Sequence, residues 1–115
     1  VFALRNDRTD EACLALCNGF FSDSALLRHE VAYVLGQMQN TVAIPKLIEV
    51  LSNEQEHVMV RHEAAEALGA IGDYSVIPVL QKYLNHQLPE ISESCEVAID
   101  LLDWTKSKEY DAIDC

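Results

Sequence analysis

The chain has 115 residues and a formal net charge of −11, from 8 basic and 19 acidic side chains. This charge argues against binding to nucleic acid or to anionic membranes. It favours a basic partner or a cationic substrate, although solubility alone explains it equally well. Apolar residues make up 50% of the sequence, which argues against disorder, yet no apolar run is long enough to cross a bilayer.

Six helices are predicted from the spacing of the apolar residues, and they form three pairs. In chain order they span residues 9–20, 25–39, 41–52, 58–72, 75–85 and 89–104. Ser24 is the expected N-cap of the second helix, Pro45 lies close to the start of the third, and Gly72 ends the fourth. The chain is therefore expected to be all-α.

The sequence repeats itself at an offset of 33 residues, which is the distance from position 28 to position 61. The tripeptide Arg-His-Glu at 28–30 recurs at 61–63, and the dipeptide Ile-Pro at 44–45 recurs at 77–78. A repeat of this length with two helices per unit is typical of an α-solenoid. We predict a HEAT-like solenoid of about three helical hairpins, preceded by part of another helix.

Both ends of the chain depart from the paired pattern. Residues 3–6 align with residues 34–37 of a second helix, so we expect the chain to begin inside a helix and to lack earlier repeats. The first residue is not Met, which is expected of a fragment. Residues 1–6 do not have the pattern of a secretion signal. Residues 105–115 are polar and acidic, and we expect them to form a loose tail after a lobe that spans residues 1–104.

The repeated His-Glu pair is the strongest candidate for a functional site. His29 and His62 take equivalent places near the N-termini of neighbouring second helices, whose axes should lie about 8–10 Å apart. Two imidazoles placed in this way can meet on one metal ion. Glu30 and Glu63 lie one residue further round their helices, so they should point beside this ion, towards a second metal, a bound cation or solvent.

Two interpretations of these pairs remain open. Two histidines and one carboxylate would form a facial triad that suits non-haem iron, and a partner with its own His-Glu pairs would complete the site. Alternatively, the side chains are solvated, the glutamates are favoured by the helix dipole, and Arg28 and Arg61 pair with nearby carboxylates on the surface. Spacing alone does not choose between the two.

Other residues carry weaker signals. Tyr33 and Glu66 follow His29 and His62 by one helical turn, so Tyr33 either lines a pocket or packs, and Glu66 adds negative charge. The histidines at 57 and 86 fall in the connections between units and are expected to be solvated. The four cysteines have no Cys-X-X-Cys spacing, and they are expected to be reduced and structural, as in a cytosolic protein.

Several motifs closely resemble the C-terminal half of the deoxyhypusine hydroxylase family, over residue 1 to about residue 104. They are Phe-Ala-Leu-Arg-Asn at 2–6, Leu-Arg-His-Glu-Val at 27–31, Tyr-Val-Leu-Gly-Gln at 33–37, Val-Arg-His-Glu at 60–63 and Glu-Ser-Cys-Glu-Val-Ala at 93–98. Members of this family are two-lobed HEAT-repeat enzymes in which each lobe gives two His-Glu pairs to a di-iron centre. The resemblance therefore implies one lobe of a cytoplasmic, non-haem di-iron monooxygenase with iron as its cofactor.

The resemblance also implies a substrate and a role for each residue of the pairs. The family uses molecular oxygen to hydroxylate the deoxyhypusine side chain of the precursor of eukaryotic translation initiation factor five A. By this resemblance, His29 and His62 would ligate one iron. Glu30 would be a carboxylate ligand that reaches the iron of the other lobe. Glu63 would be a metal ligand or would meet the cationic substrate chain. Since the N-terminal lobe is missing, the fragment alone is expected to be inactive and to need that lobe or a second copy.

A binding module is the other function that the sequence supports. In this hypothesis the helical array holds a basic peptide or protein partner, and the His-Glu pairs are polar surface. Replacement of His29 and His62 by Ala would separate the two hypotheses, because only an enzyme lobe would lose metal.

Overall fold

The structure, a computed structural model, describes residues 9–114 and their side chains up to residue 109. Within these residues all regular elements are helical. The α-helices are α2 (Asp10–Cys17), α3 (Ala25–Met38), α4 (Ile44–Ser52), α5 (Val58–Ile71), α6 (Ile77–Lys82) and α7 (Pro89–Asp114). Short 3-10 turns at Asn18–Phe21, Thr41–Ala43 and Tyr74–Val76 adjoin α2, α4 and α6. The prediction of an all-α chain is confirmed.

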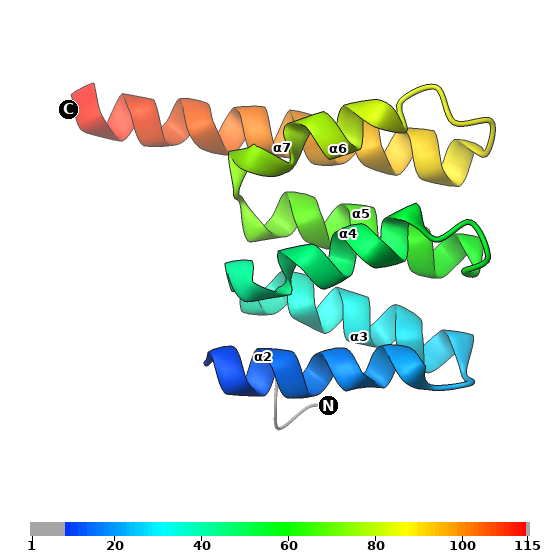
Figure 1. Ribbon diagram of the computed structural model, residues 1–115. Coiled ribbons are helices and arrows are strands. Elements are labelled where there is room, and N and C mark those ends of the chain that lie inside the picture. Colours follow the sequence, from blue (N-terminus) through cyan, green and yellow to red (C-terminus); the bar gives the residue numbers. More distant parts are fainter. Residues whose placement is uncertain (1–8, 115) are drawn as a thin grey trace.

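The helices stack as three hairpins in two layers (Figure 1). The first helices of the hairpins, α2, α4 and α6, lie in one layer, and the second helices, α3, α5 and α7, lie in the other. Within the second layer, α5 packs between α3 and α7. This arrangement confirms the predicted solenoid and makes the second helices direct neighbours. The helix predicted to begin the chain lies outside the described residues.

The local sequence sets where the second helices begin and end. The Ser24 hydroxyl accepts a hydrogen bond from the backbone N–H of Leu27, so Ser24 is the N-cap of α3, as predicted. Helix α5 ends at Gly72, whose φ of 85° is the left-handed conformation that glycine adopts without strain. The equivalent residue of α3 is Gln39, with a φ of 54°, and its side chain donates to the Ala70 carbonyl at 2.9 Å. A strained cap therefore ties one hairpin to the next.

Glycines allow the second helices to approach one another closely. A Cβ atom added at Gly36 of α3 would lie 2.9 Å from the Cα atom of Ala67 in α5. The same relation holds one hairpin later, where a Cβ at Gly69 would lie 2.9 Å from the Cα of Ala98 in α7. Real Cβ atoms do not come this close to backbone, so the repeated glycine is explained by the contact between neighbouring second helices.

The end of the last helix was predicted incorrectly. The sequence predicts a helix that stops near Trp104 and a loose tail, whereas α7 continues to Asp114 and extends beyond the stack (Figure 1). A helix that has already formed propagates easily through residues without Gly or Pro, even where no apolar stripe exists. Tyr74 also holds this segment, since the Lys106 ammonium lies 4.0 Å from its ring centre. The division of the chain into a lobe and a tail at residue 104 stays a prediction.

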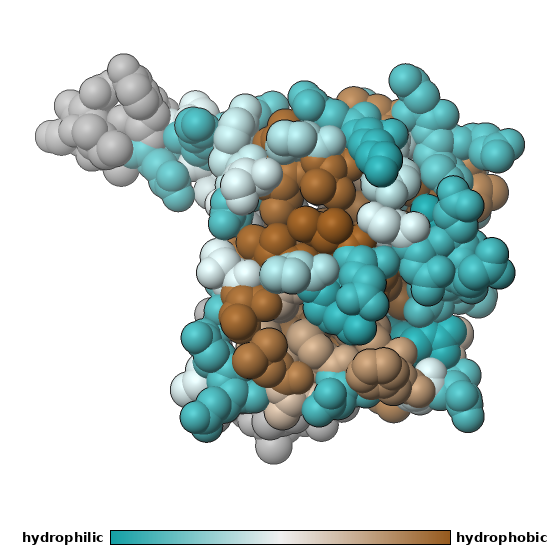
Figure 2. Space-filling view, in the orientation of Figure 1, coloured by the Kyte–Doolittle hydropathy of each residue, from teal (hydrophilic) through white to brown (hydrophobic). Residues whose placement is uncertain are grey.

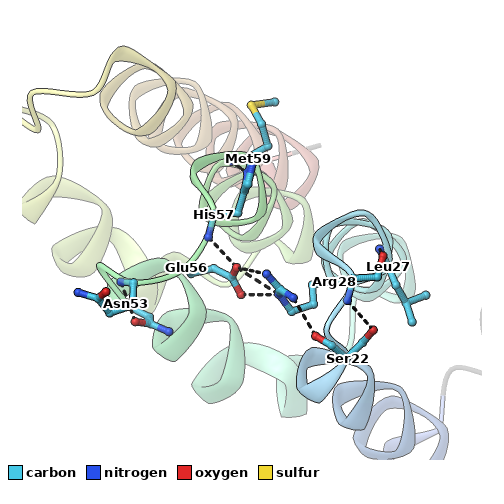
Figure 3. A network of polar contacts seen from close by, with 9 residues as sticks. Ser22, Leu27, Arg28, Asn53, Glu56, His57 and Met59 are labelled. Carbon is cyan, nitrogen blue, oxygen red and sulfur yellow. Dashed lines mark hydrogen bonds and ion pairs between the residues drawn. The ribbon is translucent and has the colours of Figure 1, made fainter.

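Arg28 connects the first two hairpins through a network of polar contacts (Figure 3). Its guanidinium donates to both carboxylate oxygens of Glu56, at 2.8 and 2.9 Å, and to the Ser22 carbonyl at 2.8 Å. Arg61 is the equivalent residue of the next hairpin, but it is buried and donates through Nε to the Leu51 carbonyl. Its Nη2 atom has no hydrogen-bond partner among the described residues. Of the two arginines, only Arg28 therefore pairs with a carboxylate.

Apolar side chains are also visible on the outside of the first layer. Figure 2 shows them gathered over α4 and α6, the helices that carry the partly buried Ile44, Ile48 and Val79. Within residues 9–114, no helix combines the length and the apolar character that crossing a membrane requires.

Candidate metal centre

The two predicted histidines occupy equivalent places on neighbouring helices. His29 is the fifth residue of α3, which begins at Ala25, and His62 is the fifth residue of α5, which begins at Val58. Because α3 and α5 pack side by side, both imidazoles lie on the same end of the second layer. The fold thus produces the juxtaposition that the 33-residue repeat predicts.

An ion pair between the two helices joins His29 to Glu63. The His29 Nε2 atom of α3 lies 2.9 Å from the Glu63 Oε2 atom of α5. The Glu63 side chain is only 10% exposed, whereas that of His29 is 36% exposed. Glu63 therefore faces its neighbouring repeat from within the protein rather than pointing into solvent.

A second contact joins His62 to Glu66, one turn further along α5. The His62 Nε2 atom lies 3.0 Å from the Glu66 Oε1 atom. On the other side of the ring, Nδ1 lies 3.1 Å from the carbonyl oxygen of Glu90 at the start of α7 and donates to it. That carbonyl also accepts a hydrogen bond from the Ser94 hydroxyl at 2.7 Å. Such a carbonyl fixes the orientation of the imidazole and leaves Nε2 directed at the carboxylates.

These side chains form a donor set of the kind that holds a metal ion. One ligand atom from each of His62, Glu63 and Glu66 lies within 4.8 Å of the others. Two atoms bound to one ion at about 2.1 Å are at most about 4.2 Å apart, so small side-chain rotations bring these donors to a common ion. Imidazole nitrogen and carboxylate oxygen suit non-haem iron, and they also accept zinc, manganese or nickel. The residues present therefore fit a transition metal.

The electrostatics of Glu63 favour a cation at this place. Burial raises the pKa of Glu63 above its usual range, and the nearby charge of Glu66 raises it further. His29 and His62 oppose this shift but do not cancel it. Two carboxylates that repel each other in a partly dry environment are stabilised by a shared positive charge, which is what a bound metal ion or an amine provides.

A cleft of about 800 Å³ opens beside the carboxylates. Its walls come from all three second helices: Tyr33, Gly36, Gln37, Gln39, Glu63, Glu66, Ala67, Ala70, Val97, Ala98 and Leu101. The Gln37 amide donates to the Tyr33 hydroxyl at 2.6 Å, so this pair forms a polar edge to the cleft. Tyr33 therefore lines a pocket, which was one of its two predicted roles.

The structure brings together some of the predicted residues and leaves one outside. His29 pairs with Glu63, and Glu63 lies in one cluster with His62 and Glu66. Glu30 is exposed and takes part in no ion pair among the described residues. Glu66, predicted only to add charge, pairs directly with His62. The Glu90 carbonyl was missed, because a backbone atom carries no sequence signal.

The two histidines in the connections have a structural role. His57 accepts a hydrogen bond from the backbone N–H of Met59, and His86 accepts one from the N–H of Leu88, both at 3.1 Å. His57 thereby caps α5. Both rings point to their own local backbone, so neither contributes to the metal-ligand set.

The described cysteines are free and buried. Burial raises the pKa of Cys13 and the pKa of Cys95 to about 11. Their thiolates are therefore scarce at neutral pH, as expected of structural rather than reactive thiols.

Comparison with known proteins gives consistent matches. A family model for HEAT repeats matches residues 12–100. The deoxyhypusine hydroxylase of Candida albicans is 52% identical over 111 residues, which cover 96% of this chain and 35% of that protein. That of Danio rerio is 47% identical over 114 residues, covering 99% of this chain and 37% of the relative. The structure of human deoxyhypusine hydroxylase in complex with glycerol matches with a TM-score of 0.85 and 49% identity, over 89% of this chain and 35% of that chain. The chain spans little more than a third of the length of these relatives.

Proposed function

This chain belongs to the HEAT-repeat family, and on that premise we propose that it forms one metal-binding lobe of a deoxyhypusine hydroxylase. The observation that carries the proposal is the contact of His29 with buried Glu63 across two repeats, beside the pair of His62 and Glu66. A donor set of two imidazoles and two carboxylates matches the chemistry that the names of the relatives imply.

We infer that the resident metal is iron, held by His29, His62 and Glu63. Bound iron would supply the redox chemistry by which molecular oxygen hydroxylates a carbon atom. The protein's own residues would hold the metal and orient its ligands. The Glu90 carbonyl fixes the ring of His62, and the buried position of Glu63 keeps one carboxylate aimed at the site.

The acidic cleft is proposed to receive the amine-bearing side chain of the substrate. Glu63 and Glu66 line the cleft at the metal-ligand set, and a cationic chain that enters there meets both carboxylates. The substrate in this proposal is a deoxyhypusine-containing protein, the precursor of eukaryotic translation initiation factor five A. Exposed Glu30 would be a ligand at a site that this chain shares with a second lobe. That lobe would be either the part of the relatives that this chain does not span or a second copy of the chain. The proposed location of the enzyme is the cytoplasm.

The test is metal binding and turnover with matched histidine variants. For the chain alone we expect weak binding of anaerobic Fe²⁺ or Co²⁺ and no hydroxylation. Joined to the part of the relatives that it does not span, it should bind iron and hydroxylate a deoxyhypusine-containing protein. His62→Ala should weaken metal binding by at least about 100-fold, because removal of a metal ligand lowers the affinity more than removal of a residue that only supports a ligand. His57→Ala is the control, because His57 only caps a helix.

Two results would contradict the proposal. Equal metal affinity of His62→Ala and His57→Ala in the two-lobed protein would show that the His-Glu residues are polar surface. Tight binding of two iron ions with full activity by the chain alone would show that no second lobe is needed. A non-catalytic module that binds a basic partner is the alternative, and it predicts lost partner binding with unchanged metal content.

A further inference from the structure

Tyr33 and Glu66 occupy equivalent places on neighbouring second helices. Tyr33 is the ninth residue of α3 and Glu66 is the ninth residue of α5, each one turn after the histidine of its own helix. Both side chains line the cleft of about 800 Å³ beside the metal-ligand set. Because α3 and α5 pack directly on each other, these two side chains lie at the same level of the second layer, on adjacent helices.

The ring of Tyr33 is open to a cation. Elsewhere in the chain, lysine ammonium groups lie between 4.0 and 5.8 Å from the ring centres of Phe21, Tyr74, Tyr83 and Trp104. Among residues 9–109, no Lys or Arg side chain lies over the ring of Tyr33, although this residue is 46% exposed. The ring is therefore available to a cation from outside the chain.

The hydroxyl group of Tyr33 is held by its own helix. The Gln37 amide, one turn further along α3, donates a hydrogen bond to this hydroxyl at 2.6 Å. Since a phenol hydroxyl lies in the plane of its ring, the hydrogen bond restrains the ring at its edge and occupies neither face. The orientation of the ring is thus restrained before a ligand binds, which lowers the entropic cost of binding.

Glu66 offers a carboxylate oxygen in the same cleft. Its Oε1 atom lies 3.0 Å from Nε2 of His62, and its Oε2 atom has no partner among the described residues. The Glu66 side chain is 44% exposed, and no Lys or Arg side chain from the described part of the chain lines the cleft. The negative charge of Glu66 is therefore not compensated by a Lys or Arg of the cleft.

The separation of α3 and α5 suits one compact cation. An ammonium group interacts with an aromatic ring within about 6 Å of the ring centre, and it pairs with a carboxylate within about 4 Å. These two distances together span about 10 Å, and the axes of neighbouring helices lie about 8–10 Å apart. One ammonium group therefore reaches Tyr33 and Glu66 together. Ala67 and Ala70 of α5 adjoin them in the cleft, and their methyl groups provide an apolar surface for methylene groups.

We propose that the Tyr33 ring and the Glu66 carboxylate together bind the ammonium group of a linear alkyl amine, whose methylene groups lie over Ala67 and Ala70. In the two-lobed enzyme the amine belongs to the substrate side chain, an assignment that rests on the proposed function. The inference deepens that function, because it adds Tyr33 as a specificity-determining residue. The ammonium site itself requires no metal.

The first test titrates the metal-free chain with the linear diamine cadaverine at low salt, followed by the NMR chemical shifts of backbone amides. Tyr33→Phe should bind cadaverine as the unaltered chain does, because the ring remains. Tyr33→Leu should weaken binding by about two- to fivefold, the value of an exposed cation–π contact. The uncharged diol of the same length should not bind. Phe21→Leu is the control, since it removes a 78% exposed ring outside the cleft.

Three results of this titration would overturn the proposal. Equal affinity of Tyr33→Leu and the unaltered chain would show that the ring takes no part. Equal weakening by Tyr33→Phe and Tyr33→Leu would assign the effect to the hydroxyl group. Equal binding of the diol would show that the cleft does not recognise charge. If Tyr33→Leu fails to fold, Glu66→Gln decides, because it should weaken cadaverine binding and reduce its salt dependence.

The second test separates a protein side chain from a free diamine as the source of the amine. In the two-lobed protein, Tyr33→Leu should raise the KM for the deoxyhypusine-containing protein by about two- to fivefold and leave kcat unchanged, because only substrate binding is weakened. An unchanged KM beside weakened cadaverine binding would overturn the assignment to the substrate. If the two-lobed protein neither binds iron nor hydroxylates, the proposed function and this assignment fail, and the cadaverine titration still decides whether the ammonium site exists.

Discussion

At the scale of single residues, Glu56 shows how one carboxylate joins two hairpins. Its side chain is 9% exposed and contacts Arg28 through three hydrogen bonds. Partial burial opposes ionisation of Glu56, but hydrogen bonds from Arg28 and from the backbone N–H of His57, together with the charge of Arg28, lower its pKa below the usual range. The charged form of Glu56 therefore stabilises the folded chain.

This shift predicts a pH-dependent effect of Glu56→Gln. The pKa of Glu56 is lower in the folded than in the unfolded chain, where it is about 4.3, so its contribution is present above that value and is lost as pH falls through the folded pKa. At pH 7 we expect Glu56→Gln to lower the free energy of unfolding by about 1–2 kcal/mol, as for other charge-assisted hydrogen bonds. Urea denaturation at pH 7 and pH 3 measures the difference, which should be smaller at pH 3. The exposed Glu54→Gln is the control, and a difference independent of pH would contradict the assignment.

At the scale of helices, the spacing between α3, α5 and α7 depends on two glycines. Gly36 and Gly69 face the backbone of the next second helix, where an added Cβ would be 2.9 Å away. Gly72 serves a different purpose, since no heavy atom lies within 4 Å of its added Cβ and only its φ of 85° favours glycine.

The two kinds of glycine should respond differently to alanine. Gly72→Ala should cost about 1 kcal/mol, the strain of a left-handed residue with a side chain. Gly36→Ala and Gly69→Ala gain about 1 kcal/mol of helix propensity but must push two backbones apart, so we expect a net loss of about 2 kcal/mol each. Chemical denaturation of the three variants measures this order. A stabilised Gly36→Ala variant would show that the helices separate without cost.

The helices themselves were predictable, because their signals are local. Ser24 caps α3 and Gly72 ends α5 by hydrogen bonds and dihedral angles within a few residues. The end of α7 was not predictable in this way. Its continuation past Trp104 depends on residues without a helix-stop signal and on Tyr74, which is distant in sequence.

The candidate site was predictable only in part, for a similar reason. The repeat places His29 and His62 on neighbouring helices, and the structure brings them near the same carboxylates. The register of the repeat does not determine which glutamate side chain is buried. In the structure Glu63 is buried and Glu30 is exposed. The hydrogen bond from His62 to the Glu90 carbonyl needs the packing of α7 on α5, which no motif encodes.

At the scale of the whole molecule, the net charge of −11 is the dominant feature. Nineteen acidic side chains on a chain this small repel one another more in the folded state than in the expanded unfolded state. Few of these negative charges are compensated by a basic partner. Within the described residues, the Lys and Arg side chains that form ion pairs are those of Arg28 and Lys46. Screening by salt should therefore weaken the repulsion between acidic side chains more than it weakens the attraction within the ion pairs.

We accordingly expect the metal-free chain to become more stable with salt. Raising NaCl from about 0.01 to 0.15 M should add about 0.5 kcal/mol, or about 3 °C in Tm for a domain of this size. Choline chloride at equal ionic strength should give the same rise, because screening does not depend on which cation is present. A rise in stability with NaCl alone would instead indicate a cation bound between Glu63 and Glu66. In that case His62→Ala should alter the rise, although this variant leaves the charge of the acidic groups unchanged. A fall in Tm with both salts would show that the Arg28 pair outweighs the repulsion, since that pair is the attraction that salt would weaken.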